Sequence, residues 1–123
     1  MKPKQINKSL TESQKRILFD KGTEPAFSGK FVHDKEKGIY KCANCGNPLF
    51  SSGVKYDPGC GWPSFWEPIS DTAVEYRKDL SFGMDRTEVI CKNCGGHLGH
   101  VFTDGPKPTG QRFCINSLSL DKE

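Results

Sequence analysis

The sequence predicts a mainly β domain of antiparallel sheet, with one short N-terminal helix and a structural metal site built from four cysteines. Three observations support this fold class. Short β-rich runs broken by turns fill most of the chain, and only one stretch has helical periodicity. Hydrophobic residues make up only 34% of the 123 residues, so a thin core would gain from a metal that cross-links the chain. We expect a single domain over residues 10–120, after a flexible N-terminus at residues 1–9.

The helical pattern covers residues 10–21. Ser9 or Thr11 can cap its N-terminus, and Gln14 stands where its side chain completes a capping box with Thr11. Gly22 follows the last periodic residue, and helices commonly end on a glycine with positive φ. We therefore expect one short helix that ends at Gly22.

Strands are expected along the remainder of the chain. Their ranges are residues 38–42, 48–50, 82–84, 87–91, 100–103 and 112–115. The segment between the last two is rich in Gly and Pro, which predicts a hairpin connection at residues 104–110. Strands that follow one another without intervening helices favour an antiparallel sheet over βαβ units.

Two C-x-x-C-G motifs predict the metal site. Cys42 and Cys45 form one pair, and Cys91 and Cys94 form the other. Four thiolates suit tetrahedral zinc and leave no open position, so we expect one structural zinc ion per chain. The glycine after each pair can adopt positive φ, which turns backbone N–H groups toward the sulfurs. Iron in a rubredoxin-like site remains an alternative, because the ligands alone do not select the metal. A thioredoxin-type redox pair is disfavoured, because two copies occur and no helix follows either.

The other two cysteines are candidates for redox chemistry. If residues 112–116 form a strand, period-two alternation places Arg112, Cys114 and Asn116 on one face. A cation and an amide beside a thiol favour its reactive thiolate form. Cys60 lies between two glycines in a loop. The competing interpretation is that these cysteines are inert, buried, small hydrophobic residues.

Three further side chains could serve a bound substrate. His97 and His100 follow the second cysteine pair and could supply hydrogen bonds or protons to a bound oxygen atom. Trp62, in the glycine-flanked loop, offers an aromatic wall for a sulfur-containing group. The histidines could instead be spare metal ligands, and the tryptophan could belong to the core.

Several motifs, in order along the chain, resemble those of the B-type methionine sulfoxide reductases. The similarity covers about residues 10–120 and includes G-T-E, F-S-G, G-C-G-W-P-S-F, R-T-E-V, H-L-G-H-V-F, D-G-P, P-T-G and R-F-C-I-N-S, together with the second cysteine pair. The resemblance implies two antiparallel β-sheets, with zinc at the end away from the active site. It also implies reduction of methionine-R-sulfoxide, mainly in oxidised proteins, to methionine.

The resemblance also implies roles for individual residues. Cys114 matches the catalytic cysteine and Cys60 the resolving cysteine, with thioredoxin as the usual reductant. Trp62 matches the wall that receives the substrate methyl group. The substrate-binding residues implied are Trp62, His97, Phe102, Arg112 and Asn116. His100, or a water that it orients, would protonate the departing sulfoxide oxygen.

The chemistry of the residues agrees with these roles. A Cys114 thiolate can attack the electrophilic sulfur and be left as a sulfenic acid. Cys60 can condense with that sulfenic acid to form a disulfide, which an external dithiol reopens.

Charge and hydropathy limit the partners. The net charge is only +3 with no block of like charges, so a nucleic-acid partner is not expected. No stretch of 18 apolar residues predicts a membrane span, and the N-terminus lacks the apolar stretch of a signal peptide. We expect a cytoplasmic monomer. The alternative class is a zinc-bearing β binding module without catalysis, which would not need Cys114, Trp62 and the two histidines together.

Overall fold

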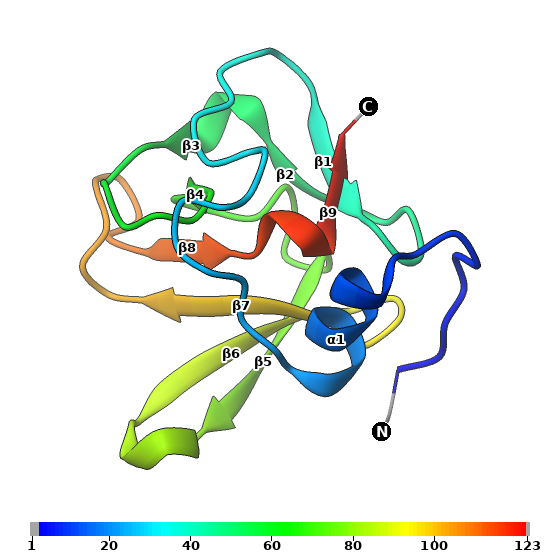
Figure 1. Ribbon diagram of the computed structural model, residues 1–123. Helices are drawn as coiled ribbons and strands as arrows, with labels where there is room; N and C mark the ends of the chain where they lie inside the picture. The colour runs from blue at the N-terminus through cyan, green and yellow to red at the C-terminus, as the bar shows by residue number, and fades with distance from the viewer. Residues whose placement is uncertain (1–2, 123) are drawn as a thin grey trace.

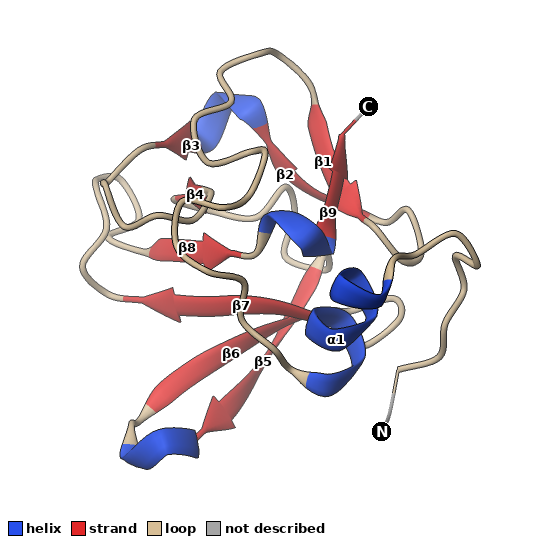
Figure 2. Cartoon of the chain, in the orientation of Figure 1, coloured by secondary structure: helices blue, strands red, loops and turns tan. Residues whose placement is uncertain are grey.

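The computed structural model describes residues 3–122, and within them the chain forms two antiparallel sheets and one α-helix, α1 (Glu12–Asp20) (Figures 1 and 2). The smaller sheet has the order β2-β1-β9 and the larger one the order β3-β4-β8-β7-β6-β5. The strands are β1 (Ile39–Cys42), β2 (Pro48–Ser51), β3 (Lys55–Tyr56), β4 (Ser64–Phe65), β5 (Val74–Asp79), β6 (Arg86–Cys91), β7 (His97–Phe102), β8 (Arg112–Ile115) and β9 (Leu120–Lys122). Three short 3-10 turns join them: η1 (Ser52–Val54), η2 (Ser81–Gly83) and η3 (Ser117–Ser119). The predicted fold class is confirmed.

Aromatic side chains from both sheets form the centre of the core. Tyr40 and Phe50 come from the smaller sheet, Phe65 and Phe113 come from the larger one, and all four have no exposed surface. The rings of Phe50 and Phe65 stack with centroids 4.4 Å apart, and the Tyr40 ring meets Phe65 edge-on at 5.2 Å. These contacts fix how the two sheets pack.

The start of α1 agrees with the sequence and its end does not. Thr11 is the N-cap, and its capping box with Gln14 is present. The left-handed residue at the C-terminus is Lys21, with φ of 57°, rather than Gly22. The Gly22 N–H donates instead to the Arg16 carbonyl oxygen at 3.0 Å. Lys21 adopts this left-handed conformation, and its ammonium lies 3.3 Å from the Glu88 carboxylate.

The expected strand at residues 82–84 is wrong, because this segment lies in and just after η2, the turn between β5 and β6. Strand β5 was not predicted. Most of its side chains are exposed, so its sequence lacks the alternation of a half-buried strand. The hairpin at residues 104–110 is confirmed, since β7 and β8 pair antiparallel with Phe102 opposite Arg112.

The flexible N-terminus remains a prediction. Residues 1 and 2 lie outside the described part of the chain. Further along, the N–H groups of Ile6 and Asn7 donate to the side-chain oxygen of Asn44, at 2.7 and 3.2 Å. Within residues 3–122, no helix has the length and apolar character needed to cross a bilayer.

Candidate active site and metal centre

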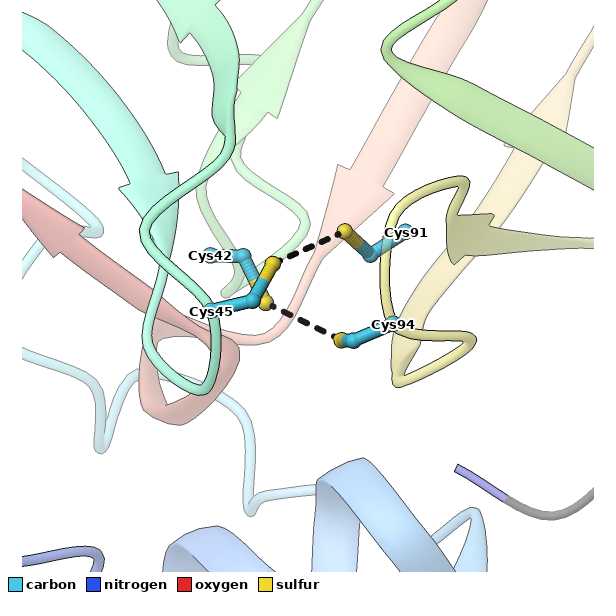
Figure 3. A group of neighbouring side chains, drawn as sticks. All are labelled: Cys42, Cys45, Cys91 and Cys94. Carbon is cyan, nitrogen blue, oxygen red and sulfur yellow. Dashed lines mark hydrogen bonds between the residues drawn. The ribbon is translucent and has the colours of Figure 1, made fainter. Parts of the chain in front are cut away.

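The four cysteines of the two C-x-x-C-G motifs gather between two tight turns, one after β1 and one after β6 (Figure 3). The turns have the same backbone geometry. The Gly46 N–H donates to the Cys42 carbonyl oxygen at 2.9 Å, and the Gly95 N–H donates to that of Cys91 at 2.8 Å. Both glycines have φ of 78°, a conformation that side-chain-bearing residues rarely adopt. The glycine after each pair therefore shapes the turn that presents two sulfurs.

The sulfur positions fit a tetrahedral metal ion. The four Sγ atoms lie within 4.8 Å of one another. Cys42 and Cys94 are 3.7 Å apart and Cys45 and Cys91 are 3.6 Å apart at their sulfurs, close to the ~3.8 Å edge of a tetrahedron with zinc–sulfur bonds of about 2.3 Å. Hydrogen bonds among the thiols lower the pKa of Cys94 and raise that of Cys42, so a cation between them would be needed to hold all four as thiolates. The cluster can hold a metal.

Cys114 lies at the other end of the larger sheet and lines a small pocket. The pocket has a volume of about 100 Å³. Its walls are Thr23, Trp62, Arg86, Gly99, His100, Phe102, Cys114 and Asn116. Arg86 begins β6 and Cys91 ends it, so five residue steps along the strand, about 17 Å, separate a wall of this pocket from the metal centre.

Cys60 is the thiol beside Cys114. The two Sγ atoms are 3.9 Å apart, and Cys60 Sγ also contacts Ser64 Oγ at 3.3 Å. Cys60 lines a different surface pocket from that of Cys114, with Tyr56 and Arg112 in its wall. The pair can therefore be approached from two sides, one at each sulfur.

The pKa values of the two thiols are shifted in opposite directions. Burial raises the pKa of Cys114 to about 12, and the nearby Cys60 adds to this effect, whereas Arg112 opposes it. Burial also disfavours a Cys60 thiolate, but hydrogen bonds, the first from Ser64, outweigh it and lower the pKa of Cys60 below its ordinary value. Cys60 is therefore the more readily ionised of the two thiols, and Arg112 does not bring the pKa of Cys114 below its ordinary value, contrary to what its place in the sequence predicts.

A carboxylate holds the pocket histidine. His100 Nε2 lies 2.7 Å from Asp79 Oδ2. The Ser81 N–H and hydroxyl both donate to Asp79, at 3.0 and 2.6 Å, and Arg86 approaches it at 3.5 Å. These contacts, those of Ser81 first, hold the pKa of Asp79 well below its usual range. Burial lowers the pKa of His100, and the Asp79 hydrogen bond partly offsets this.

His97 lies behind His100 and outside the wall of the pocket. The two rings meet edge-on with centroids 5.5 Å apart. His97 Nδ1 lies 2.7 Å from the Glu88 carboxylate, with both side chains almost fully buried. The other nitrogen of His97 is buried and makes no hydrogen bond. His97 therefore contacts the site through His100.

The backbone of Glu24 holds two pocket residues at once. The Trp62 indole N–H donates to the Glu24 carbonyl oxygen, and the Glu24 N–H donates to the Asn116 side-chain oxygen, both at 3.0 Å. The buried Glu24 carboxylate accepts from the Leu118 N–H at 2.9 Å, and burial raises its pKa. Asn116 also donates its amide N–H to the Leu98 carbonyl oxygen at 3.0 Å, so both ends of its amide are fixed.

Arg112 supports the pocket from outside its wall. Its guanidinium makes a two-pronged contact with Asp104, at 2.9 and 3.3 Å, and its Cζ atom lies 4.4 Å from the centre of the Phe102 ring. This stacking positions Phe102, which does line the pocket.

Comparison with known proteins identifies the family. The model of the SelR domain matches residues 10–123. Three peptide methionine sulfoxide reductases MsrB of Escherichia coli, from strains E24377A, K12 / DH10B and EC4115, are each 54% identical to this chain over 116 residues. The matched region covers 94% of this chain and 85% of each relative. The chain belongs to the SelR family. The resemblance to the B-type methionine sulfoxide reductases is confirmed.

In this SelR domain, sequence reasoning missed Asp79, Glu88, Glu24 and Arg86. Asp79 lies at the end of β5, the strand that was not predicted. One signal could have found it, because an Asp two residues before a Ser commonly accepts the backbone N–H of that residue in a turn. Glu24 and Glu88 stand within recognised motifs, but the partner of Glu24, Asn116, is far along the chain, and Glu88 meets His97 only through the pairing of β6 with β7.

Proposed function

We propose that this chain reduces methionine-R-sulfoxide, mainly in oxidised proteins, to methionine through Cys114 and Cys60. Membership of the SelR family and the names of its relatives support methionine sulfoxide reduction. One observation carries the finer assignment: Cys114 lines a small pocket, and its Sγ has a second thiol 3.9 Å away. The chain is thus an oxidoreductase acting on sulfur: the two thiols give electrons to the sulfoxide and become a disulfide, which is the acceptor when the reaction is written in reverse.

The pocket suits the end of a methionine sulfoxide side chain. Trp62 and Phe102 provide apolar walls for the methyl group, and His100 provides a polar side for the oxygen. Asn116 also lines the pocket, and a hydrogen bond from the Glu24 N–H holds its side chain in place. Because methyl and oxygen have different walls, only one configuration at sulfur can present that sulfur to Cys114, and we assign it as R.

Reduction begins with attack of Cys114 sulfur on the sulfoxide sulfur. The proton of Cys114 leaves to solvent as its sulfur attacks, and the nearby Arg112 favours the thiolate that forms. The oxygen passes to Cys114, which becomes a sulfenic acid, and methionine leaves with its sulfur reduced. His100, held by Asp79, protonates the oxygen directly or through an oriented water.

Resolution uses the same pair of thiols. The Cys60 thiol attacks the Cys114 sulfenic acid, a sulfur–sulfur bond forms, and the oxygen leaves as water. An external dithiol, which we assign as thioredoxin, then attacks the disulfide and regenerates two thiols. Cys60 lines its own surface pocket, which offers that reductant an approach away from the substrate pocket.

We assign the four-cysteine cluster to one structural zinc ion per chain. Cys42, Cys45, Cys91 and Cys94 would hold it, and its four sulfur ligands would leave no position for substrate. The ion would cross-link the two turns of the fold and supply no step of the reaction. We further propose that the protein acts as a monomer in the cytoplasm, without nucleic-acid or membrane partners.

A zinc-bearing β binding module is the competing class. Two observations favour catalysis over binding: Cys114 has a second thiol beside it, and His100 in the same pocket is hydrogen-bonded to Asp79. A module that only binds a partner requires neither feature. The test is NADPH consumption by the chain in a thioredoxin system, measured separately on the resolved R and S epimers of a peptide methionine sulfoxide. We expect turnover on the R epimer alone. Equal rates on both epimers would overturn the pocket assignment, and no turnover on either would overturn the function.

A further inference from the structure

We propose that the turn joining β5 and β6 is a docking surface for apolar residues that flank the oxidised methionine of a polypeptide substrate. The proposal rests on the proposed function and adds the substrate class that the same site prefers. The occupant is an extended or unfolded segment rich in apolar side chains around the methionine sulfoxide.

Large apolar side chains cluster at this turn and face solvent. Leu80 is 63% exposed, Phe82 is 88% exposed and Met84 is 45% exposed. Single exposed apolar residues are common on protein surfaces, but three within five residues form a patch of the kind that marks binding sites. The Lys78–Asp85 ion pair, at 3.0 Å, joins β5 to the residue just before β6 at the base of the turn.

The backbone of the turn makes an aromatic residue at its tip unexpected. The Met84 N–H donates to the Ser81 carbonyl oxygen at 3.1 Å, and the two central residues, Phe82 and Gly83, have φ of 57° and 69°. This is the pattern of a type I′ hairpin turn, whose first central residue is usually Asn, Asp or Gly. Phe82 is strained there and contributes almost no burial. Folding alone does not account for it, and strain of this kind is typical of functional positions.

The turn continues directly from the substrate pocket. Asp79, the residue before Leu80, holds the pocket histidine, and Arg86, two residues after Met84, lines the pocket itself. Figure 1 shows the β5–β6 hairpin reaching away from the other strands, with the turn at its outer end. A chain that places one side chain in the pocket therefore has this apolar turn beside its path.

The chemistry of the substrate fits this surface. The pocket, of about 100 Å³, takes the end of one side chain, so the flanking residues of a polypeptide must lie outside it. In an extended segment, residues two positions away lie about 7 Å from the sulfoxide residue and reach the surface beside the pocket. Methionine is usually buried among apolar residues, and its oxidation disrupts cores, so oxidised segments that become accessible carry apolar neighbours.

The test uses Phe82→Gly, which removes the ring and relieves the strained φ. Rates are measured on three R-sulfoxide substrates: a peptide with Leu and Val beside the sulfoxide, the same peptide with Gly at those positions, and N-acetylmethionine sulfoxide. We expect kcat/KM on the apolar peptide to fall about tenfold, equivalent to ~1.4 kcal/mol. We expect less than a twofold change on the other two substrates. The matched control is Ile6→Ser, because Ile6 is 55% exposed and its backbone is bound to Asn44 beside the metal centre.

The outcomes separate this proposal from the proposed function. Wild-type protein that reduces all three substrates, with Phe82→Gly equally active on each, would overturn the docking surface and leave the function standing. Wild-type protein inactive on every sulfoxide would overturn the function and the docking surface with it. A fall on all substrates together with a lower melting temperature would assign Phe82 to stability instead. A wild-type dimer that Phe82→Gly dissociates would assign the turn to self-association.

Discussion

Replacing Cys60 by serine should separate the two sulfur steps that we propose. Cys60 Sγ and Cys114 Sγ are 3.9 Å apart, and a disulfide bond measures about 2.05 Å, so the atoms need to approach by about 1.9 Å. The cysteines of the metal centre are much further away. Cys114 pairs with His100 and His100 with Glu88, and Cys91 lies about 10 Å further along β6. Disulfides need Cα atoms within about 7 Å of each other, so Cys60 is the partner within reach.

The structure therefore predicts one methionine released per chain of Cys60→Ser, with Cys114 left as sulfenic acid. Multiple turnover with thioredoxin should be lost, because thioredoxin attacks disulfides and none can form. Methionine is quantified by chromatography after mixing with excess substrate, and the oxidation state of Cys114 by mass spectrometry.

The wild type, treated with substrate in the absence of reductant, is the control, and it should contain a Cys60–Cys114 bridge. Thioredoxin-dependent cycling of Cys60→Ser at the wild-type rate would refute the reasoning. A bridge from Cys114 to any other cysteine would refute it as well.

Three changes test other parts of the account. Cys91→Ser should lose zinc and unfold at a much lower temperature, whereas the wild type should contain one zinc per chain by elemental analysis; folded, active wild-type protein without metal would contradict this. Burial lowers the pKa of His100 and the Asp79 carboxylate raises it, so Asp79→Asn should lower that pKa further. If protonated His100 is the acid, activity is present below its pKa and lost above it, so the basic limb of the kcat profile should move to lower pH; an unmoved limb would argue against this role. Trp62→Phe removes the hydrogen bond to Glu24 at 3.0 Å, and it should raise KM severalfold at a cost of ~1 kcal/mol in stability, measured by kinetics and thermal melting; an unchanged KM would assign Trp62 to the core.

The parts of the fold that the sequence predicts well are those with local causes. The capping box of Thr11 and Gln14 lies within one helical turn. Each cysteine turn is closed by a hydrogen bond between two residues that are four positions apart in the sequence. Strands β3, β4 and β9 have only two or three residues, which is too short for a periodic pattern. Their existence depends on pairing with distant strands.

The candidate site follows the same rule. The reactive residues stand in short motifs, but the groups that position them come from elsewhere, such as Asp79 for His100 and Glu24 for Trp62. His97 illustrates the limit. In a regular strand, His97 and His100 would point to opposite faces. A register shift in the pairing of β6 with β7 brings the two histidine rings together, with centroids 5.5 Å apart. No sequence pattern predicts that shift.

The central claim is that Cys114 sulfur is the atom that attacks the sulfoxide. The direct measurement is single-turnover release of methionine from the R epimer by Cys114→Ser, alongside its zinc content and melting temperature. The account predicts no methionine above background from a folded protein with its zinc retained, because a serine hydroxyl is a poor nucleophile toward this sulfur. Release near one methionine per chain would contradict the claim and place the attacking atom elsewhere.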